Sequence, residues 1–175
     1  RVAYYYIFSD SDTPLGTIQE NPLLGIERAM WSPDGAFLLV FLRHRMGIRL
    51  WKCDERFPRA TFPHPKHGGG DKGVAFSADG RWLALLHRSA AREQREVIIV
   101  YDCHHPDWAA VQMHHSPEAG VFLDDIAFVP HGDHTRQLRP ALMAWEAPAF
   151  SERIFIFSPD GQSCKVVRDH QLSDD

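Results

Sequence analysis

Two short segments contain residue types that can bind metal ions. Cys103, His104 and His105 are consecutive, and His114 and His115 follow further along the chain. Thiolates and imidazoles are good zinc ligands. However, adjacent His side chains point apart on an extended chain, and the four-ligand spacing of a zinc site is absent. The sequence therefore favours exposed loop histidines and predicts no bound metal.

A glycine-rich segment, HGGGDK at residues 67–72, has part of the chemistry of a phosphate-binding loop. The full signature needs a glycine, four further residues and then Gly-Lys-Ser/Thr at the start of a helix. In this chain Gly73 follows the lysine, and a strand-like segment comes next. We therefore expect a flexible loop here and no nucleotide or other cofactor.

Four acidic residues could supply a pair of catalytic carboxylates: Asp124, Asp125, Glu146 and Glu152. General acid–base catalysis needs one carboxyl with a raised pKa and one with an ordinary pKa. Acidic residues more commonly cap strand ends, and no Gly-x-Ser-x-Gly nucleophile motif is present. The sequence thus predicts no catalytic residues and a protein that is not an enzyme.

The elements that would position these residues follow from a repeated turn. An aromatic residue and a tight turn precede an apolar run in WSPDG (31–35), FSADG (76–80) and the divergent FVPHG (128–132). Proline fixes φ for a turn, aspartate caps it through its side chain, and glycine takes the position with φ > 0. The following runs are rich in residues that favour strands. Each copy therefore predicts a β-hairpin.

A second landmark recurs in phase with the first. Apolar runs end in an aromatic residue at Phe8, Trp51, Tyr101 and Phe157. The resulting period of roughly 40 to 55 residues is close to the length of one four-stranded propeller blade. No long segment has the 3.6-residue apolar period of a helix. We predict an all-β protein, a WD40-type β-propeller with about three whole four-stranded antiparallel blades and the outer strands of another.

The repeats predict the following division of one larger propeller: outer strands of a partial blade at residues 1–22, blades at 23–66, 67–117 and 118–170, and a tail at 171–175. In the first whole blade we expect strands at 28–31, 36–41, 47–51 and 60–62. A blade buries its faces only against neighbouring blades. We therefore expect a segment cut from a longer protein, the alternative being a ring that another polypeptide completes.

One further turn sequence, FSPDG at residues 157–161, could be mistaken for the start of a new blade. It lies too close to Phe128 for a new blade and directly ends an apolar run. We interpret it as the turn between the third and fourth strands, with residues 163–167 as the fourth. By the same logic residues 9–14 form such a turn in the partial blade, and 17–19 form its last strand.

The composition excludes several classes of protein. The 175 residues are 44% hydrophobic and 24% charged, an ordinary globular balance. The formal net charge of −4 provides no basic field for nucleic acid. Cys53, Cys103 and Cys164 fit no disulfide or zinc framework and predict free thiols. No apolar run is long enough to span a membrane.

Several stretches together resemble one family of WD-repeat proteins. They are WSPDG at 31–35, KGVAFSADGRWLAL at 72–85, LMAWE at 142–146, RIFIFSPDG at 153–161 and Asp107-Trp108. In order and spacing they are similar to the middle of the centrosomal and spindle-pole WD-repeat protein eight family. There are departures, since Trp51-Lys52, Tyr101-Asp102 and Phe157-Ser158 replace the Trp-Asp dipeptide and extra residues occur at 131–139.

The resemblance implies a non-enzymatic interaction scaffold in the cytoplasm, at the centrosome or spindle pole, with roles in microtubule anchoring and in spindle or cilium assembly. It implies a coiled-coil microtubule-anchoring partner and a minus-end-directed kinesin, and it transfers no catalytic residues. The alternatives are the non-catalytic propeller of a prolyl-oligopeptidase-like or TolB-like protein, and a translation-initiation propeller. The partner-binding residues are unknown, and loop charges at Arg92, Arg95, Asp124 and Asp125 are the first candidates.

Overall fold

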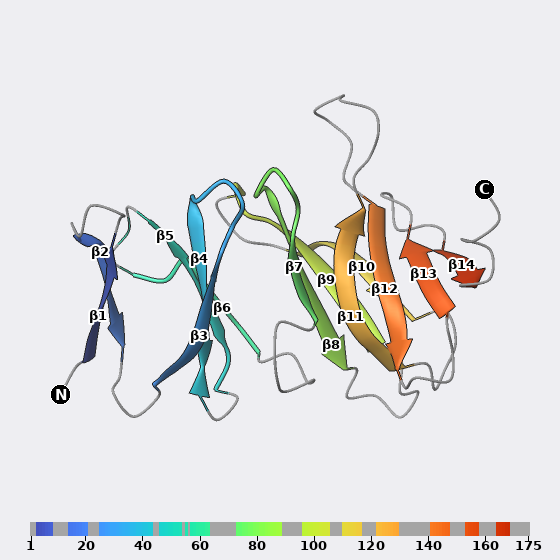
Figure 1. Ribbon diagram of the computed structural model, residues 1–175, viewed down its shortest axis with the longest axis horizontal. Coiled ribbons are helices and arrows are strands. Elements are labelled where there is room, and N and C mark those ends of the chain that lie inside the picture. The colour runs from blue at the N-terminus through green and yellow to red at the C-terminus, as the bar shows by residue number, and fades with distance from the viewer. Residues whose placement is uncertain are drawn as a thin grey trace. The chain divides into compact units, whose positions relative to one another are not determined.

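A computed structural model shows an all-β chain, and its described part contains fourteen strands, numbered in sequence order (Figure 1). For some of these strands only the backbone is described. The structure describes residues 3–8, 14–20, 25–43, 46–53, 55, 57–63, 73–88, 96–105, 110–116, 122–129, 141–147, 153–157 and 164–168. Among these residues no helix is long and apolar enough to span a membrane.

The strands form three four-stranded antiparallel sheets and one two-stranded sheet, and within each sheet the neighbours in sequence are the neighbours in space. The two-stranded sheet contains β1 (Ala3–Phe8) and β2 (Pro14–Glu20). The first four-stranded sheet contains β3 (Ile26–Trp31), β4 (Phe37–Leu42), β5 (Ile48–Lys52) and β6 (Ala60–Phe62). The second contains β7 (Val74–Phe76), β8 (Trp82–Arg88), β9 (Glu96–Asp102) and β10 (Ala110–His115). The third contains β11 (Phe122–Val129), β12 (Ala141–Ala147), β13 (Arg153–Phe157) and β14 (Cys164–Arg168). The predicted fold class is therefore confirmed.

The chain divides into two compact units, residues 1–64 and 65–175. The first unit contains β1 to β6, and the second contains β7 to β14. In the first four-stranded sheet the expected strands agree with the observed ones to within two residues at each end. The last strand of the two-stranded sheet is longer than expected, because β2 pairs with β1 from Pro14 to Glu20.

The turn between β3 and β4 has the geometry that its sequence predicts. The Ser32 hydroxyl accepts a hydrogen bond from the Phe37 amide at 2.9 Å and donates to the Asp34 carboxylate. Asp34 in turn accepts from the Ala36 amide at 3.1 Å. Gly35 has φ of +70°, in the left-handed region that favours glycine. These bonds satisfy the polar groups of the turn within the turn itself.

The turn between β7 and β8 repeats this arrangement. The Ser77 hydroxyl accepts from the Trp82 amide at 2.9 Å and donates to Asp79, and Gly80 has φ of +72°. The Ser77 amide also donates to the Trp82 carbonyl at 2.9 Å. The two turns are structurally equivalent, as the sequence repeat predicts.

The FSPDG segment that begins at Phe157 does not open a new sheet. Phe157 is the last residue of β13, and it pairs with Leu142 of β12 on one side and Cys164 of β14 on the other. It therefore belongs to the third strand of its sheet, and β14 is the fourth. The prediction for this segment is confirmed, with the fourth strand one residue later than expected at each end.

The second and third four-stranded sheets pack against each other. In the ribbon, β11 lies beside β7 and β8 (Figure 1). One apolar cluster connects the sheets and consists of Trp82, Ala84, Leu86, Ile98 and Val100 from one and Leu123, Ile126, Ala144, Phe155 and Phe157 from the other. The alternate residues of β8 and β9 supply the first group, as expected for strands with one face toward a neighbouring sheet.

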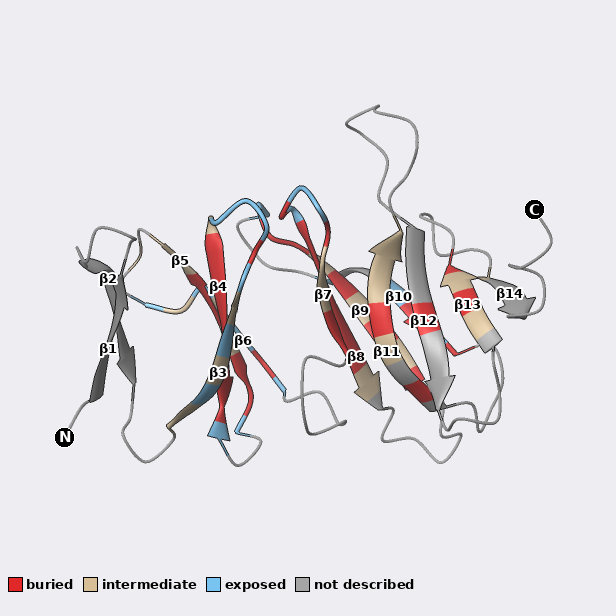
Figure 2. Cartoon of the chain, viewed as in Figure 1, coloured by how far each residue is buried: buried red, intermediate tan, exposed pale blue. Residues whose placement is uncertain are grey.

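The first four-stranded sheet is also buried along its middle strands. All six residues of β4 are buried (Figure 2). Leu38, Val40 and Leu42 share one face with Trp51, and Ile26 packs on this cluster. Both faces of β4 are therefore covered.

The sequence predicts that the periodic aromatic residues lie in the core or between blades. Trp51 and Phe157 are buried, which confirms the prediction for them, whereas Phe76 and Phe128 are half-buried. Tyr101 is only half-buried. Trp31 is 42% exposed, so for this residue the prediction is wrong. Trp31 is the last residue of β3, which is an edge strand of its sheet. Among the described strands, β3 pairs with β4 alone.

Candidate interaction surfaces

Two carboxylates connect the second and third sheets in opposite directions. Glu96, at the start of β9, is fully buried and accepts a hydrogen bond from the Leu123 amide of β11. Asp125, on β11, accepts from the Gly73 amide just before β7 at 2.9 Å. A carboxylate that accepts backbone N–H bonds makes a strong, directional link. These two bonds therefore join the second sheet to the third. The sequence analysis did not identify Glu96 as a candidate residue.

His114 forms a third contact between these sheets. Its side chain is buried, and its ring lies 5.0 Å from that of Phe157. The expectation of exposed loop histidines is wrong for His114, because β10 turns this residue toward β13. His104 and His105 are exposed in a turn, as predicted, and His115 is exposed but lies in β10.

The structure describes the candidate metal-binding residues but not the candidate phosphate loop. Across the described part of the chain, no three His, Cys, Asp or Glu side chains come together in a way that could hold a metal ion. Cys103 is buried and is not part of a disulfide. The glycine-rich segment at residues 67–72 lies outside the described residues.

Of the four candidate carboxylates, only the side chain of Asp125 is described. Asp125 is half-buried, and its carboxylate accepts bonds from the Gly73 amide and from its own neighbour Ile126 at 2.8 Å. This carboxylate acts structurally, as a link and a cap. Glu152 and the side chains of Asp124 and Glu146 lie outside the described residues.

The candidate partner-binding charges need the same correction. Asp124 and Asp125 lie in β11 rather than in a loop. Charge reversal at Asp125 would break the bond to Gly73, so it would test the sheet contact rather than a binding surface. Arg92 and Arg95 lie outside the described residues.

An ion pair joins the turn after β7 to the end of β9. The Arg81 guanidinium lies 2.9 Å from the Asp102 carboxylate and 4.8 Å above the Trp82 ring. Asp102 also accepts from the His104 amide at 3.0 Å. Burial alone would raise the pKa of Asp102, but the bonds from Arg81 and from the His104 amide outweigh it and hold the pKa below its usual value. The hydrogen bond to Asp102 raises the pKa of Arg81.

This pair gives the second residue of the repeat's closing dipeptide a structural role. Asp102 follows Tyr101 at the position where a Trp-Asp dipeptide is expected. Arg81 lies in the turn between β7 and β8, directly before the residue that pairs with Asp102. In the first four-stranded sheet the corresponding residues are Lys52 and Ala36, which cannot form such a pair. An arginine directly after the turn glycine is the sequence signal that could have revealed the contact.

His87 introduces a pH dependence into the second sheet. It is half-buried in β8, and its Nε2 is buried without a hydrogen-bond partner among the described residues. Burial lowers the pKa of His87 below the ordinary value of 6.5, because the charged form loses solvation. A group with a lowered folded-state pKa contributes stability that is present above the unfolded pKa and lost as the pH falls through the folded pKa. We therefore expect stability to fall as the pH drops below 6.5, and His87→Leu to reduce that slope in thermal denaturation measured near neutral pH and in mild acid.

His105→Leu is the matched control, because His105 is exposed. It should leave the pH dependence unchanged. Equal slopes for the wild-type protein and His87→Leu would contradict the assignment.

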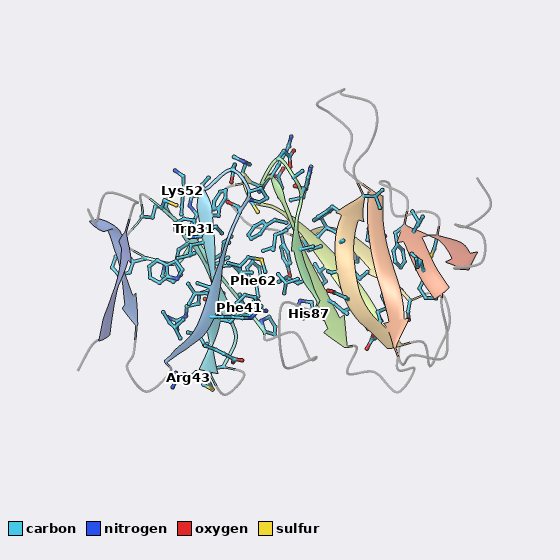
Figure 3. The ribbon with its side chains drawn as sticks, in the orientation of Figure 1. Trp31, Phe41, Arg43, Lys52, Phe62 and His87 are labelled. Atoms are coloured by element: carbon cyan, nitrogen blue, oxygen red, sulfur yellow. The ribbon has the colours of Figure 1, made fainter. Side chains whose placement is uncertain are left out.

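Four large apolar side chains are exposed in the described regions: Trp31, Met46, Phe57 and Met113. Trp31 and Lys52 lie at one end of the first four-stranded sheet and Arg43 lies at the other (Figure 3). Propeller sheets carry their loops at these two ends, where binding residues usually lie. Trp31 ends β3 and Met113 lies in β10, whereas Met46 and Phe57 lie outside the strands.

Comparison with known proteins supports the same architecture. The chain is 26% identical over 139 residues to the WD repeat-containing protein WRAP73 of Mus musculus, a match that covers 79% of this chain and 26% of the relative. The chain thus spans about a quarter of the length of that curated relative. No family model matches the chain.

Solved propellers have a similar structure. The dihydro-heme d1 dehydrogenase NirN matches with a TM-score of 0.56 and 14% identity, over 94% of this chain and 32% of its own. The WD40 domain of SCAP from fission yeast matches with a TM-score of 0.54 and 10% identity, over 96% and 34%. A complex of the fission yeast SREBP and SCAP binding domains matches with a TM-score of 0.50 and 12% identity, over 86% and 35%. Likenesses at this identity establish the fold alone. Together with the repeated sheets and turns, they show that the chain has the fold of β-propeller blades, similar to those of a WD40 domain.

Proposed function

We propose that these blades belong to a non-enzymatic protein-interaction scaffold that acts at the centrosome or spindle pole. The observation that carries the proposal is the 26% identity to a WD-repeat protein over 79% of the chain. The turn and strand motifs, which resemble those of the spindle-pole WD-repeat family, also point to a WD-repeat protein. The partners on this proposal are a coiled-coil microtubule-anchoring factor and a minus-end-directed kinesin.

The side chains of the described residues support a binding role more than a catalytic one. The carboxylates of the buried Glu96 and the half-buried Asp125 accept bonds from backbone amides, and that of Asp102 accepts bonds from Arg81 and a backbone amide. Groups held in this way stabilise the blades and leave no free acid–base pair among them. One enzyme among the structural neighbours, NirN, is only 14% identical and contributes no argument for activity.

A solved neighbour illustrates the binding role. The fission yeast complex contains a SCAP binding domain together with one from SREBP, so a propeller of similar fold forms a protein complex. Propellers present loops from both ends of each blade on a rigid support. This arrangement fits a scaffold that holds several proteins at once.

The proposal is tested with the full-length protein. Affinity capture should recover a coiled-coil microtubule-anchoring factor, and imaging should place the protein at centrosomes or spindle poles. Purified protein should not hydrolyse peptide or nucleotide substrates. Robust hydrolysis, co-sedimentation with ribosomes or a purely periplasmic location would each overturn the scaffold assignment.

A further inference from the structure

The outer edges of the four sheets differ in how they are protected. An edge strand presents unpaired N–H and C=O groups, and proteins block such edges with short strands, proline or charged side chains. β6 has three residues between Pro58 and Pro63. β14 contains Lys165 and Arg168, and β2 begins at Pro14 and ends at Glu20.

β10 lacks the proline and charged residues of the other outer strands, and its one irregularity lies at its start. It is six residues long, its sequence is AVQMHH, and it contains no proline, lysine, arginine or carboxylate. It is the terminal strand of its sheet, paired only with β9 among the described strands. Its pairing is regular from Gln112 to His115, with one irregularity between Ala110 and Gln112.

The ladder to β9 determines which backbone groups of β10 face outward. The Ser116 amide donates to the Glu96 carbonyl at 2.9 Å. Hydrogen-bonded and non-hydrogen-bonded residues alternate along an antiparallel ladder. His114 therefore bonds inward to β9, and the N–H and C=O groups of Met113 and His115 face away from the sheet.

The side chains of β10 follow the same alternation. His114 and Ser116 are buried on the face toward the third sheet. Met113 is 55% exposed, and His115 is exposed as well. The two residues with outward backbone groups thus also carry the exposed side chains, one apolar and one able to carry positive charge.

We propose that β10 is a docking edge that receives an extended segment of a partner protein as a fifth strand of this sheet. The segment carries an apolar residue opposite Met113 and, two residues away, a carboxylate opposite His115. Such cross-strand pairs on one face stabilise an added strand, and main-chain bonds supply the rest. This inference deepens the scaffold function proposed above and rests on it.

A second copy of this chain fits the edge less well. Residues whose backbone groups face outward on one copy must pair with the same kind of residue on the other copy. Antiparallel self-pairing through Met113 and His115 therefore gives Met–Met, Met–His or His–His pairs. No such register provides a carboxylate for His115. An acidic partner segment satisfies both side chains at once.

The test uses the full-length protein and a defined probe, the blocked peptide Thr-Val-Thr-Val-Thr-Glu-Thr. Titration should show saturable binding, and amide hydrogen exchange should slow at Met113 and His115. Met113→Lys should weaken binding by at least about 10-fold, because it removes the apolar contact and adds charge to the edge.

Met46→Lys is the matched control, because Met46 is 57% exposed and lies in the loop between β4 and β5. It should bind the peptide as the wild-type protein does, and both lysine variants should unfold at the wild-type temperature. N-methyl groups can be placed on either of the two alternating sets of peptide residues. The peptide methylated on the set whose N–H groups would donate to β10 should not bind.

Three results would overturn the docking edge. They are equal binding by the two lysine variants, binding by the N-methylated peptide in both registers, and peptide-free dimers that Met113→Lys converts to monomers. If Met113→Lys and the wild-type protein bind the peptide equally while both capture the coiled-coil factor, the edge proposal fails while the scaffold proposal stands. If the wild-type protein captures none, the scaffold proposal itself fails.

Discussion

Gly47→Ala should be among the most destabilising single-methyl additions in the first unit, by about 2–4 kcal/mol. Gly47 has φ of +118°, a backbone conformation that residues with a side chain rarely adopt. A Cβ built there would lie 2.7 Å from the Phe62 carbonyl oxygen of β6. Because that oxygen belongs to the backbone, relief requires β5 and β6 to separate next to the Ile48–Phe62 pair. Chemical denaturation of the full-length protein measures the loss.

Gly35→Ala provides the matched control. Gly35 also has a positive φ, +70°, but among the described residues no atom lies within 4 Å of its added Cβ. It should cost only the strain of a left-handed alanine, about 1 kcal/mol. If both variants lose the same stability, the close approach of Gly47 to β6 has no energetic consequence and the explanation is wrong.

Trp51→Ala should cost about 3–5 kcal/mol, the range for removing a fully buried large aromatic side chain. Trp51 is 2% exposed and packs with Leu38, Val40 and Leu42 on one face of its sheet. Its indole Nε1 is buried and makes no hydrogen bond within the described part of the chain. An unsatisfied buried donor costs about 1–3 kcal/mol. Trp51→Phe removes that donor and keeps an aromatic ring, so it should change stability by less than about 1 kcal/mol.

Two further variants separate burial from aromatic character. Tyr101→Ala should cost less than Trp51→Ala, because Tyr101 is half-buried, although the sequence repeat places both in equivalent positions. Trp31→Ala should cost about 1 kcal/mol or less, because Trp31 is 42% exposed. A Trp51→Phe variant as unstable as Trp51→Ala would show that Nε1 has a partner and that the indole is needed whole.

The strands and turns of this protein could be predicted from the sequence because they depend on local interactions. Ser32, Asp34 and Gly35 satisfy the polar groups of their own turn, and the same three residue types do so again in the next sheet. The spacing of Phe157 after Phe128 is too short for a blade, so the sequence alone assigns its turn to the third strand of a sheet. Local chemistry and repeat length are both written directly in the chain.

The contacts between sheets were not predictable in the same way. Whether His114 is exposed or buried depends on which face of β10 meets β13, and a one-residue shift in register would reverse it. The bonds from Leu123 to Glu96 and from Gly73 to Asp125 join residues far apart in the sequence. Trp31 and Trp51 both end apolar segments, yet one is exposed at a sheet edge and the other is covered. The sequence by itself determined the strands, the turns and the blade repeat, because these depend on nearby residues. Only the tertiary structure decided which side chains are buried between sheets and which edges stay open, because each of these depends on packing between distant segments.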